Sequence, residues 1–267
     1  MGVLQTQDLT VRFGGHVAVN AVSCRFEPGT LTAIVGPNGA GKTTYFNLIS
    51  GQLSATEGRV QLNGHELTGL SASARTRAGL GRAFQLTNLF PNLTVLENVR
   101  LAVQATEEGA HLHGLNLWSI WQDHAQLTTQ ALDILSQVAM LPQADAVVAS
   151  LPHGDQRKLE VALLMALKPS VYMFDEPTAG MSQDEAPVIL NLIRQLKSDK
   201  TKTILLVEHK MDVVRELADR IIVLHNGQLV ADGEPAEVMA SAVVQEAYLG
   251  AKPSAAPAVK AEEGHTP

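Results

Sequence analysis

The sequence has very little cysteine, few aromatic residues and no long apolar run. Its 267 residues include one cysteine, Cys24, and aromatic residues make up 4% of the chain. A single cysteine excludes an internal disulfide and a zinc site built on cysteines, and it fits a reducing compartment. We expect Cys24 to be a small buried apolar residue, which is the usual role of a free cysteine.

Positive charge is also scarce. The chain has 20 Lys and Arg against 27 Asp and Glu, so its formal net charge is −7. Nucleic-acid binders need clustered basic residues, and this balance argues against nucleic acid as the main partner. Arg75, Arg77 and Arg82 form a modest basic cluster, which we interpret as a solvated surface. No segment approaches the run of about 18 apolar residues that a membrane span needs, so a partner must hold the protein at any membrane.

Apolar runs alternate with helical patterns along most of the chain. Runs at 31–35, 171–174, 203–207 and 221–224 predict buried strands, with further strands at 59–62 and 81–85. Helices are predicted at 42–51, 185–196 and 211–218, and another begins near Asp155. This alternation indicates an α/β fold with a parallel sheet covered by helices.

Three other regions differ from this pattern. Short β-like stretches with turns occupy residues 3–28, before the first buried strand. Residues 86–160 are mostly helical by pattern, which predicts a helical subdomain with a surface insertion near 105–115. Residues 251–267, rich in Ala, Pro, Lys and Glu, predict a flexible tail after an ordered domain at 1–250.

A glycine-rich segment between a buried strand and a helix predicts a phosphate-binding loop. It matches G-x-x-x-x-G-K-[ST] and reads Gly36-Pro37-Asn38-Gly39-Ala40-Gly41-Lys42-Thr43. Glycines allow backbone N–H groups to turn toward an anion, and the following helix points its positive end at the phosphates. Lys42 supplies a charge for the β- and γ-phosphates, and Thr43 supplies a hydroxyl to Mg²⁺. We expect this segment and Thr44 to bind ATP.

Two later strands end in residues suited to phosphate hydrolysis. Asp175 and Glu176 follow the strand at 171–174, and His209 follows the strand at 203–207. Parallel strands place such residues at one edge of the sheet, where nucleotides bind in open α/β folds. We expect Asp175 to be a Mg²⁺ partner, Glu176 to act as a general base on water, and His209 to contact the γ-phosphate. Without the phosphate-binding loop, both strand ends would be ordinary.

Taken together, the motifs resemble those of the ABC-transporter ATPases across roughly residues 3–250. The resemblance implies a P-loop NTPase (RecA-like) core, an N-terminal antiparallel β subdomain and an inserted helical subdomain. It also implies that Gln85 is the family's Q-loop glutamine, which senses Mg²⁺ and the attacking water, and that Phe13 stacks on adenine. Leu151-Pro152-His153-Gly154-Asp155-Gln156 is similar to the family's signature sequence, so Gly154 and Asp155 would close over the γ-phosphate held by an opposite subunit.

The signature segment, residues 151–156, departs from the family pattern Leu-Ser-Gly-Gly-Gln. Pro152 replaces the serine and has neither a hydroxyl nor an N–H donor, and His153 replaces the first glycine. One missing donor at such a site costs roughly 1–3 kcal/mol. Ser182 stands where the family often has an aspartate. A regulatory module that binds nucleotide without turnover is therefore an alternative, but Glu176 and His209 argue against it.

Several segments resemble the longer ATPase of branched-chain amino-acid importers. They are Arg12-Phe13-Gly14-Gly15, Gly154-Asp155-Gln156-Arg157, Glu208-His209-Lys210-Met211 and Ala247-Tyr248-Leu249-Gly250. This resemblance implies a second, shorter ATPase, two membrane permeases, a substrate-binding protein, and a peripheral location on the cytoplasmic face of the inner membrane. Alternatives are the ATPase of a urea or amide importer or of a lipopolysaccharide exporter. A soluble ABC ATPase acting on DNA or ribosomes is disfavoured, because the chain has one cassette and an acidic balance.

Overall fold

The computed structural model describes residues 2–83, 89–106, 117–182, 184–242 and 244. Four predictions concern residues outside these ranges: the role of Gln85, most of the insertion at 105–115, the segment Ala247-Tyr248-Leu249-Gly250, and the tail at 251–267.

A six-stranded sheet forms the centre of the molecule, in the order β10-β9-β3-β8-β7-β6. Five strands run parallel, and each lies where the sequence predicts a strand: β3 (Leu31–Val35), β6 (Leu80–Ala83), β7 (Val171–Asp175), β8 (Thr203–Val207) and β9 (Arg220–His225). The sixth, β10 (Gln228–Gly233), pairs antiparallel with β9 and makes the sheet mixed at that edge. The sequence analysis does not predict β10.

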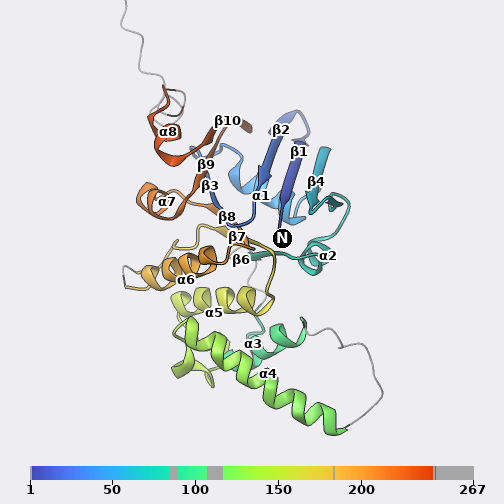
Figure 1. Ribbon diagram of the computed structural model, residues 1–267, viewed down its shortest axis with the longest axis vertical. Coiled ribbons are helices and arrows are strands. Elements are labelled where there is room, and N and C mark those ends of the chain that lie inside the picture. Colours follow the sequence, from blue (N-terminus) through green and yellow to red (C-terminus); the bar gives the residue numbers. More distant parts are fainter. Residues whose placement is uncertain (1, 84–88, 107–116, 183, 243, 245–267) are drawn as a thin grey trace, which may run out of the picture.

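A second sheet of four strands lies beside the first and is antiparallel throughout. Its order is β2-β1-β4-β5, with β1 (Leu4–Phe13), β2 (His16–Phe26), β4 (Glu57–Leu62) and β5 (His65–Glu66). Helix α1 (Lys42–Ser50) lies between the two sheets (Figure 1). Phe46 of α1 shares one buried apolar cluster with Leu4 of β1 and Met173 of β7. That shared core fixes the start of α1 relative to both sheets.

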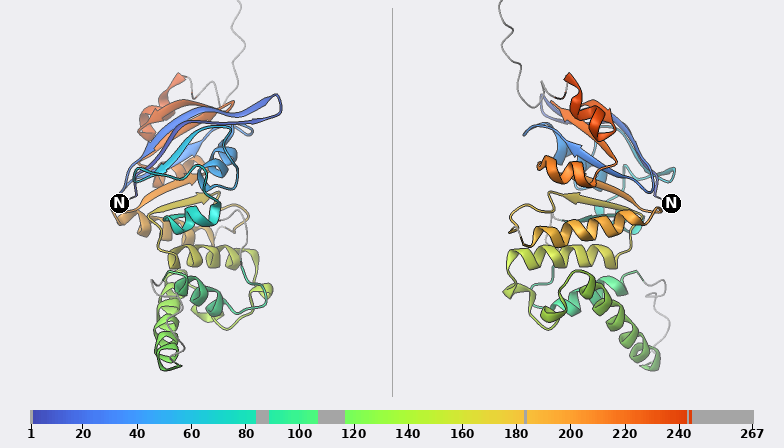
Figure 2. Two further views of the ribbon diagram at one scale, coloured as in Figure 1. Left: turned by 90° about the vertical axis from the view of Figure 1, so that its right-hand side faces the viewer. Right: turned by 60° about the vertical axis from the view of Figure 1, so that its left-hand side comes forward.

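Helices cover the other face of the central sheet and extend away from it. Helices α5 (His153–Ala166) and α6 (Ala186–Ser198) bury Leu159 and Leu192 against Phe174 of β7. Helices α3 (Val95–Gln104) and α4 (Leu117–Gln137) pack beyond α5, at the end of the molecule opposite β1 and β2 (Figure 2). The remaining helices are short: α2 (Ala72–Arg77), η1 (Leu141–Gln143), η2 (Val148–Ser150), α7 (Met211–Leu217) and α8 (Pro235–Ala240).

Helix α3 begins with a capping box. Thr94 caps α3 by accepting from the backbone N–H of Glu97, while the Glu97 carboxylate accepts from the backbone N–H of Thr94. This capping box satisfies two backbone donors that the first turn leaves open. In the part of the chain that the structure describes, no helix is both long and apolar enough to cross a membrane.

The interpretation of the arginine cluster as a solvated surface is wrong for two of its three members. Arg77 is exposed, but Arg75 is 2% exposed and donates to the carbonyl oxygens of Leu48 and Ile49 at 2.7 Å each. These carbonyls belong to the last turn of α1, where no helical N–H remains to bond them. The side chain of Arg82 is 6% exposed and is also bonded. Cys24 is 6% exposed, as expected.

Candidate functional site

The phosphate-binding loop, residues 36–43, joins β3 to α1 in a conformation that only glycine fits. The φ angle of Gly36 is 149°, and a Cβ there would lie 2.1 Å from the carbonyl oxygen of Leu224. The φ angle of Gly41 is 96°, and its Cβ would lie 2.6 Å from the carbonyl oxygen of Ala18. Both distances are too short for any side chain. The two glycines of the sequence motif are therefore required by the path of the backbone.

Lys42, the first residue of α1, folds its side chain back over the loop. Its ammonium donates to the carbonyl oxygens of Gly36 at 2.7 Å and Pro37 at 2.9 Å. Burial lowers the pKa of Lys42, while the carboxylates of Glu176 and Asp175 act in the opposite direction. A compact charge held at a helix N-terminus is a strong site for an anion.

An open cavity of about 330 Å³ lies against this loop. It brings together residues from three separate motifs and from β2. Its lining residues are His16, Ala18, Asn38, Gly39, Ala40, Gly41, Lys42, Thr43, Thr44, Glu176 and His209. Sequence reasoning missed His16 and Ala18, which belong to β2. Phe13 at the end of β1 is 51% exposed and pairs with His16 across the hairpin turn. In the sequence, Gly14-Gly15 indicates a turn, and this signal could have pointed to the residues that follow it beside the cavity.

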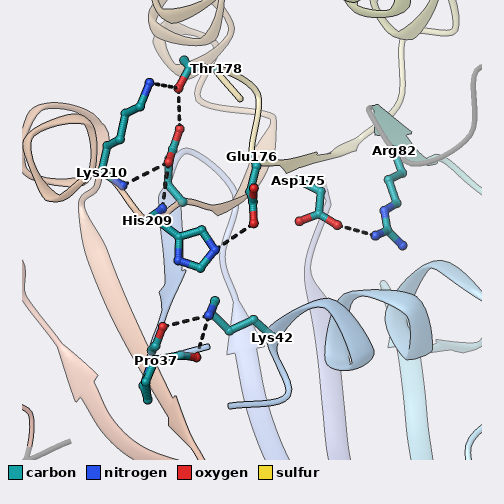
Figure 3. Close-up of polar contacts among 10 residues, drawn as sticks. Pro37, Lys42, Arg82, Asp175, Glu176, Thr178, His209 and Lys210 are labelled. Atoms are coloured by element: carbon teal, nitrogen blue, oxygen red, sulfur yellow. Dashed lines mark hydrogen bonds and ion pairs between the residues drawn. The ribbon is translucent and has the colours of Figure 1, made fainter. Parts of the chain in front are cut away.

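Glu176 and His209 meet at the edge of the cavity. They follow the neighbouring parallel strands β7 and β8, and the His209 Nε2 lies 2.7 Å from the Glu176 Oε1 (Figure 3). Glu176 has a φ angle of 50°, a conformation that few residues other than glycine adopt, and its backbone N–H donates to the carbonyl oxygen of Val207 at 2.9 Å. Both side chains are 41% exposed and face the cavity, where a carboxylate can accept a proton from water.

A buried carboxylate, Glu208, holds the turn that carries His209. Its Oε2 accepts from the backbone N–H groups of His209 at 2.7 Å and Lys210 at 3.1 Å, and its Oε1 accepts from the Thr178 hydroxyl at 2.8 Å. Lys210 Nζ donates to the same hydroxyl at 3.2 Å. Glu208 thus ties the segment after Glu176 to the segment around His209 (Figure 3). The sequence analysis assigned no role to Glu208, although a charged residue directly after an apolar strand was visible.

Asp175 lies beside Glu176 and is held by an arginine. Its Oδ2 accepts from Arg82 Nη2 at 2.7 Å, and the two side chains are 9% and 6% exposed. Together with the Thr43 hydroxyl, the Asp175 carboxylate offers hard oxygen donors of the kind that Mg²⁺ prefers. Among the described residues, no group of three His, Cys, Asp or Glu side chains could hold a metal. The Thr43 hydroxyl and the Asp175 carboxylate are too few ligands for an ion held by protein alone. They fit a Mg²⁺ ion that is also bound by the phosphates of a nucleotide.

The signature segment lies apart from this cavity. Helix α5 begins at His153 after Pro152, whose side chain has no oxygen to cap the helix. A Cβ on Gly154 would lie 2.0 Å from the Glu185 Oε1, and Asp155 pairs with Lys158 at 2.8 Å. Among the residues that the structure describes, none from α5 lines the cavity. A single chain therefore does not bring Gly154 and Asp155 to its own phosphate-binding loop.

The comparisons with known proteins agree with this geometry. The family model "ABC transporter" matches residues 19–179, and the model "Branched-chain amino acid ATP-binding cassette transporter" matches residues 228–252. The high-affinity branched-chain amino acid transport ATP-binding protein BraF of Pseudomonas aeruginosa is 36% identical, over 93% of this chain and 98% of its own length.

Solved structures give the same result. The ADP conformation of an ATP-binding cassette of an ABC transporter is 29% identical, with a TM-score of 0.76, over 94% of this chain and 100% of that one. A dimeric post-hydrolysis cassette bound to ADP and phosphate is 26% identical, with a TM-score of 0.74, over 87% of this chain and 98% of that one. The phosphate-binding loop, the strand-end residues and these similarities agree: the chain belongs to the ABC transporter family of ATP-binding cassette ATPases.

Proposed function

We propose that this chain is the ATP-hydrolysing subunit of an ABC importer for branched-chain or related amino acids. The contact between Glu176 and His209, on the cavity that also contains Lys42, carries the hydrolytic part of the proposal. The substrate class rests on the C-terminal family match at residues 228–252 and on the printed function of BraF.

The position of each side chain supports the hydrolytic role that we propose for it. The loop amides and Lys42 bind the phosphates of ATP, and the Lys42 charge stabilises the negative charge that develops on the transferred group. Glu176 orients a water molecule and accepts its proton. His209 fixes the Glu176 carboxylate through the 2.7 Å contact and reaches toward the γ-phosphate. Phe13 stacks on adenine beside the cavity.

Mg²⁺ neutralises charge on the phosphates when it is bound with ATP. In this chain, Thr43 would hold it through a hydroxyl and Asp175 through a carboxylate oxygen, and Gln85 would complete the set. The Thr43 side chain lines the cavity, and Asp175 adds to the negative charge around Lys42.

A separate apolar pocket is the proposed contact for a permease. It measures about 400 Å³ and lies between β6, α3 and α5, with Leu89, Phe90, Leu101 and Leu163 in its wall. Phe90 is 55% exposed and Leu101 is 37% exposed, so large apolar side chains are available to a partner. Leu89 and Phe90 of its wall fall within residues 85–97, the segment near which we expect permease coupling helices from the resemblance to the family. The peripheral location on the cytoplasmic face of the inner membrane follows from such a partner.

A second ATPase subunit would complete the site. Gly154 and Asp155 lie away from the chain's own cavity, so we propose that this end of α5 covers ATP held by a partner, and the similar dimeric cassette supports this arrangement. We assign residues 1–250 to the ATPase domain, with 86–160 as its helical subdomain and 251–267 as a tail.

Isolation of the assembled complex tests the proposal. The tagged chain, extracted from native membranes in mild detergent, should bring down two permeases and a shorter ATPase, identified by mass spectrometry. Reconstituted into vesicles with a binding protein, the complex should take up leucine or valine when ATP is supplied. Uptake of urea or an amide alone would assign a different importer, and recovery with lipopolysaccharide export proteins would contradict the import function.

A further inference from the structure

Arg82 is a buried side chain with three hydrogen bonds next to the proposed hydrolytic site. It extends from β6, and its guanidinium contacts three polar groups on two other elements. Nη2 donates to Asp175 Oδ2 at 2.7 Å, while Nη1 donates to Asn47 Oδ1 at 2.7 Å and to Ser50 Oγ at 2.8 Å. The guanidinium carbon also lies 5.2 Å from the centre of the Phe46 ring. Arg82 therefore connects the strand end that carries Asp175 to the helix that begins at Lys42.

A purely stabilising role is a poor explanation for this arrangement. The side chains of Arg82 and Asp175 are 6% and 9% exposed, and removing two charges from water offsets most of their attraction. Burial also lowers the pKa of Arg82, with Asp175 acting in the opposite direction. What a planar guanidinium does supply is direction, because Nη1 is fixed on Asn47 and Ser50 and this holds Nη2 in place against Asp175.

The direction matters because only one oxygen of Asp175 is engaged by Arg82. Oδ2 accepts from Nη2, and Figure 3 shows the other oxygen turned away from Arg82, toward the side on which Glu176 and Lys42 lie. The anchors on Asn47 and Ser50 come from α1, the same helix that carries Thr43 near its start. One rigid group thus sets Asp175 relative to the helix that presents the Thr43 hydroxyl.

We propose that Arg82 is a positioning residue that orients the free oxygen of Asp175 toward the Mg²⁺ bound with ATP. The proposal rests on the function proposed above. Partners that orient a metal-ligating side chain typically change metal affinity by about 10–100-fold when they are removed. The positive charge of Arg82 also repels a cation, but Asp175 compensates this charge at 2.7 Å. We expect the loss of orientation to be the larger of these two opposite effects, so that Mg²⁺ affinity falls when Arg82 is removed.

Arg75 provides a matched control. It is also a buried arginine bound to the last turns of α1, where it donates to the backbone oxygens of Leu48 and Ile49, but none of the hydrogen bonds that the structure describes for it reaches Asp175. Arg75→Met should lower thermal stability without changing the metal site. Arg82→Met removes a similar charge from a similarly buried position, and it should change both thermal stability and the metal site.

The test measures divalent-ion binding separately from nucleotide binding, using the full chain. Fluorescent ATP binding is measured in EDTA, Mn²⁺ binding to the ATP-bound chain by electron paramagnetic resonance, and stability by thermal unfolding. For Arg82→Met we expect unchanged ATP affinity in EDTA and at least a tenfold loss of Mn²⁺ affinity. For Arg75→Met we expect Mn²⁺ affinity within about twofold of the unchanged chain. If Arg82→Met does not fold, Asn47→Ala, which removes one anchor of Arg82, should weaken Mn²⁺ binding by about threefold.

Mn²⁺ affinity that is unchanged or higher in Arg82→Met, or in Asn47→Ala if that variant is used, would overturn the proposal. An equal loss in Arg75→Met would also overturn it, because the effect would then follow general stability. If the unchanged chain itself fails to bind ATP, the proposed function fails instead, so the two failures are distinguishable.

Discussion

The cavity at the phosphate-binding loop and the N-terminus of α5 differ in how their polar groups are held. At the cavity, Glu176 and His209 are joined by a short contact across β7 and β8, and the buried Glu208 holds the backbone of His209 from behind. At the start of α5, Pro152 offers no capping side chain, and Gly154 makes room for the carboxylate of Glu185. The polar groups of the cavity all come from one chain, whereas the N-terminus of α5 lies away from that chain's own cavity.

This difference suggests that changes in the cavity and at α5 have separable effects. A change in the cavity should act on ATP held by this chain, even in isolation. A change at α5 should act only when a second ATPase subunit is present. The four predictions that follow probe this separation, beginning with the largest expected effect.

Glu176→Gln should reduce ATP hydrolysis by the assembled complex by roughly 100-fold or more, because the amide cannot accept the proton of the attacking water. ATP binding should be retained, and the complex should accumulate in an ATP-bound, closed state that gel filtration and nucleotide retention detect. Lys42→Ala is the control, since it should remove ATP binding itself. Hydrolysis at the normal rate in Glu176→Gln would refute the catalytic assignment.

Gly154→Ala should lower ATPase activity of the complex by about tenfold, because the added methyl displaces Glu185 and crowds the helix end that we propose to face the partner. Nucleotide binding by the isolated chain should not change, which calorimetry can measure. Glu185→Ala in the same chain frees the space and should restore part of the activity. A loss of ATP binding in the isolated Gly154→Ala chain would show that the two regions are not separate.

Glu208→Gln should lower ATPase activity by about fivefold, since an amide cannot accept from Thr178 and from both backbone N–H groups at once. The turn at His209 would lose its fixed position while ATP binding persists. Steady-state kinetics should show a lower kcat with little change in KM. A change in KM alone would mean that Glu208 acts on binding and not on the position of His209.

Pro152→Ser should leave ATPase activity of the complex unchanged or raise it slightly. Serine adds a hydroxyl and an N–H at the start of α5, where the family pattern has them, and one additional donor can contribute roughly 1 kcal/mol. ATPase assays of the Pro152→Ser complex, run in parallel with the unsubstituted and Glu176→Gln complexes, would measure this activity. A large loss of activity would mean that the proline has a role that the geometry of α5 does not show.

The cavity was largely predictable from the sequence, since its parts are local motifs. Gly36 and Gly41 are required by the backbone itself, and apolar strands place Asp175, Glu176 and His209 at one edge of the sheet. Four of the five parallel strands followed from their apolar runs, and β6 was predicted without one. The antiparallel β10 did not, because its residues are mostly half-buried and alternate weakly.

Arg82 shows where sequence reasoning ended. Its partners, Asn47 and Asp175, are 35 and 93 residues away, so nothing near Arg82 in the sequence distinguishes a buried arginine from a solvated one. The same applies to Gly154 and Glu185, which meet only when α5 packs against α6. Side chains whose role depends on distant partners require the folded structure.

The central claim is that this chain binds ATP in its own cavity and covers a partner's ATP with α5. Cryo-electron microscopy of the complete complex, with Glu176→Gln in this chain and Mg²⁺ and ATP present, tests it most directly. We predict phosphates beside Lys42 and, separately, the γ-phosphate of the second ATPase beside Gly154. ATP beside Lys42 with α5 remote from any nucleotide in a closed complex would contradict the account.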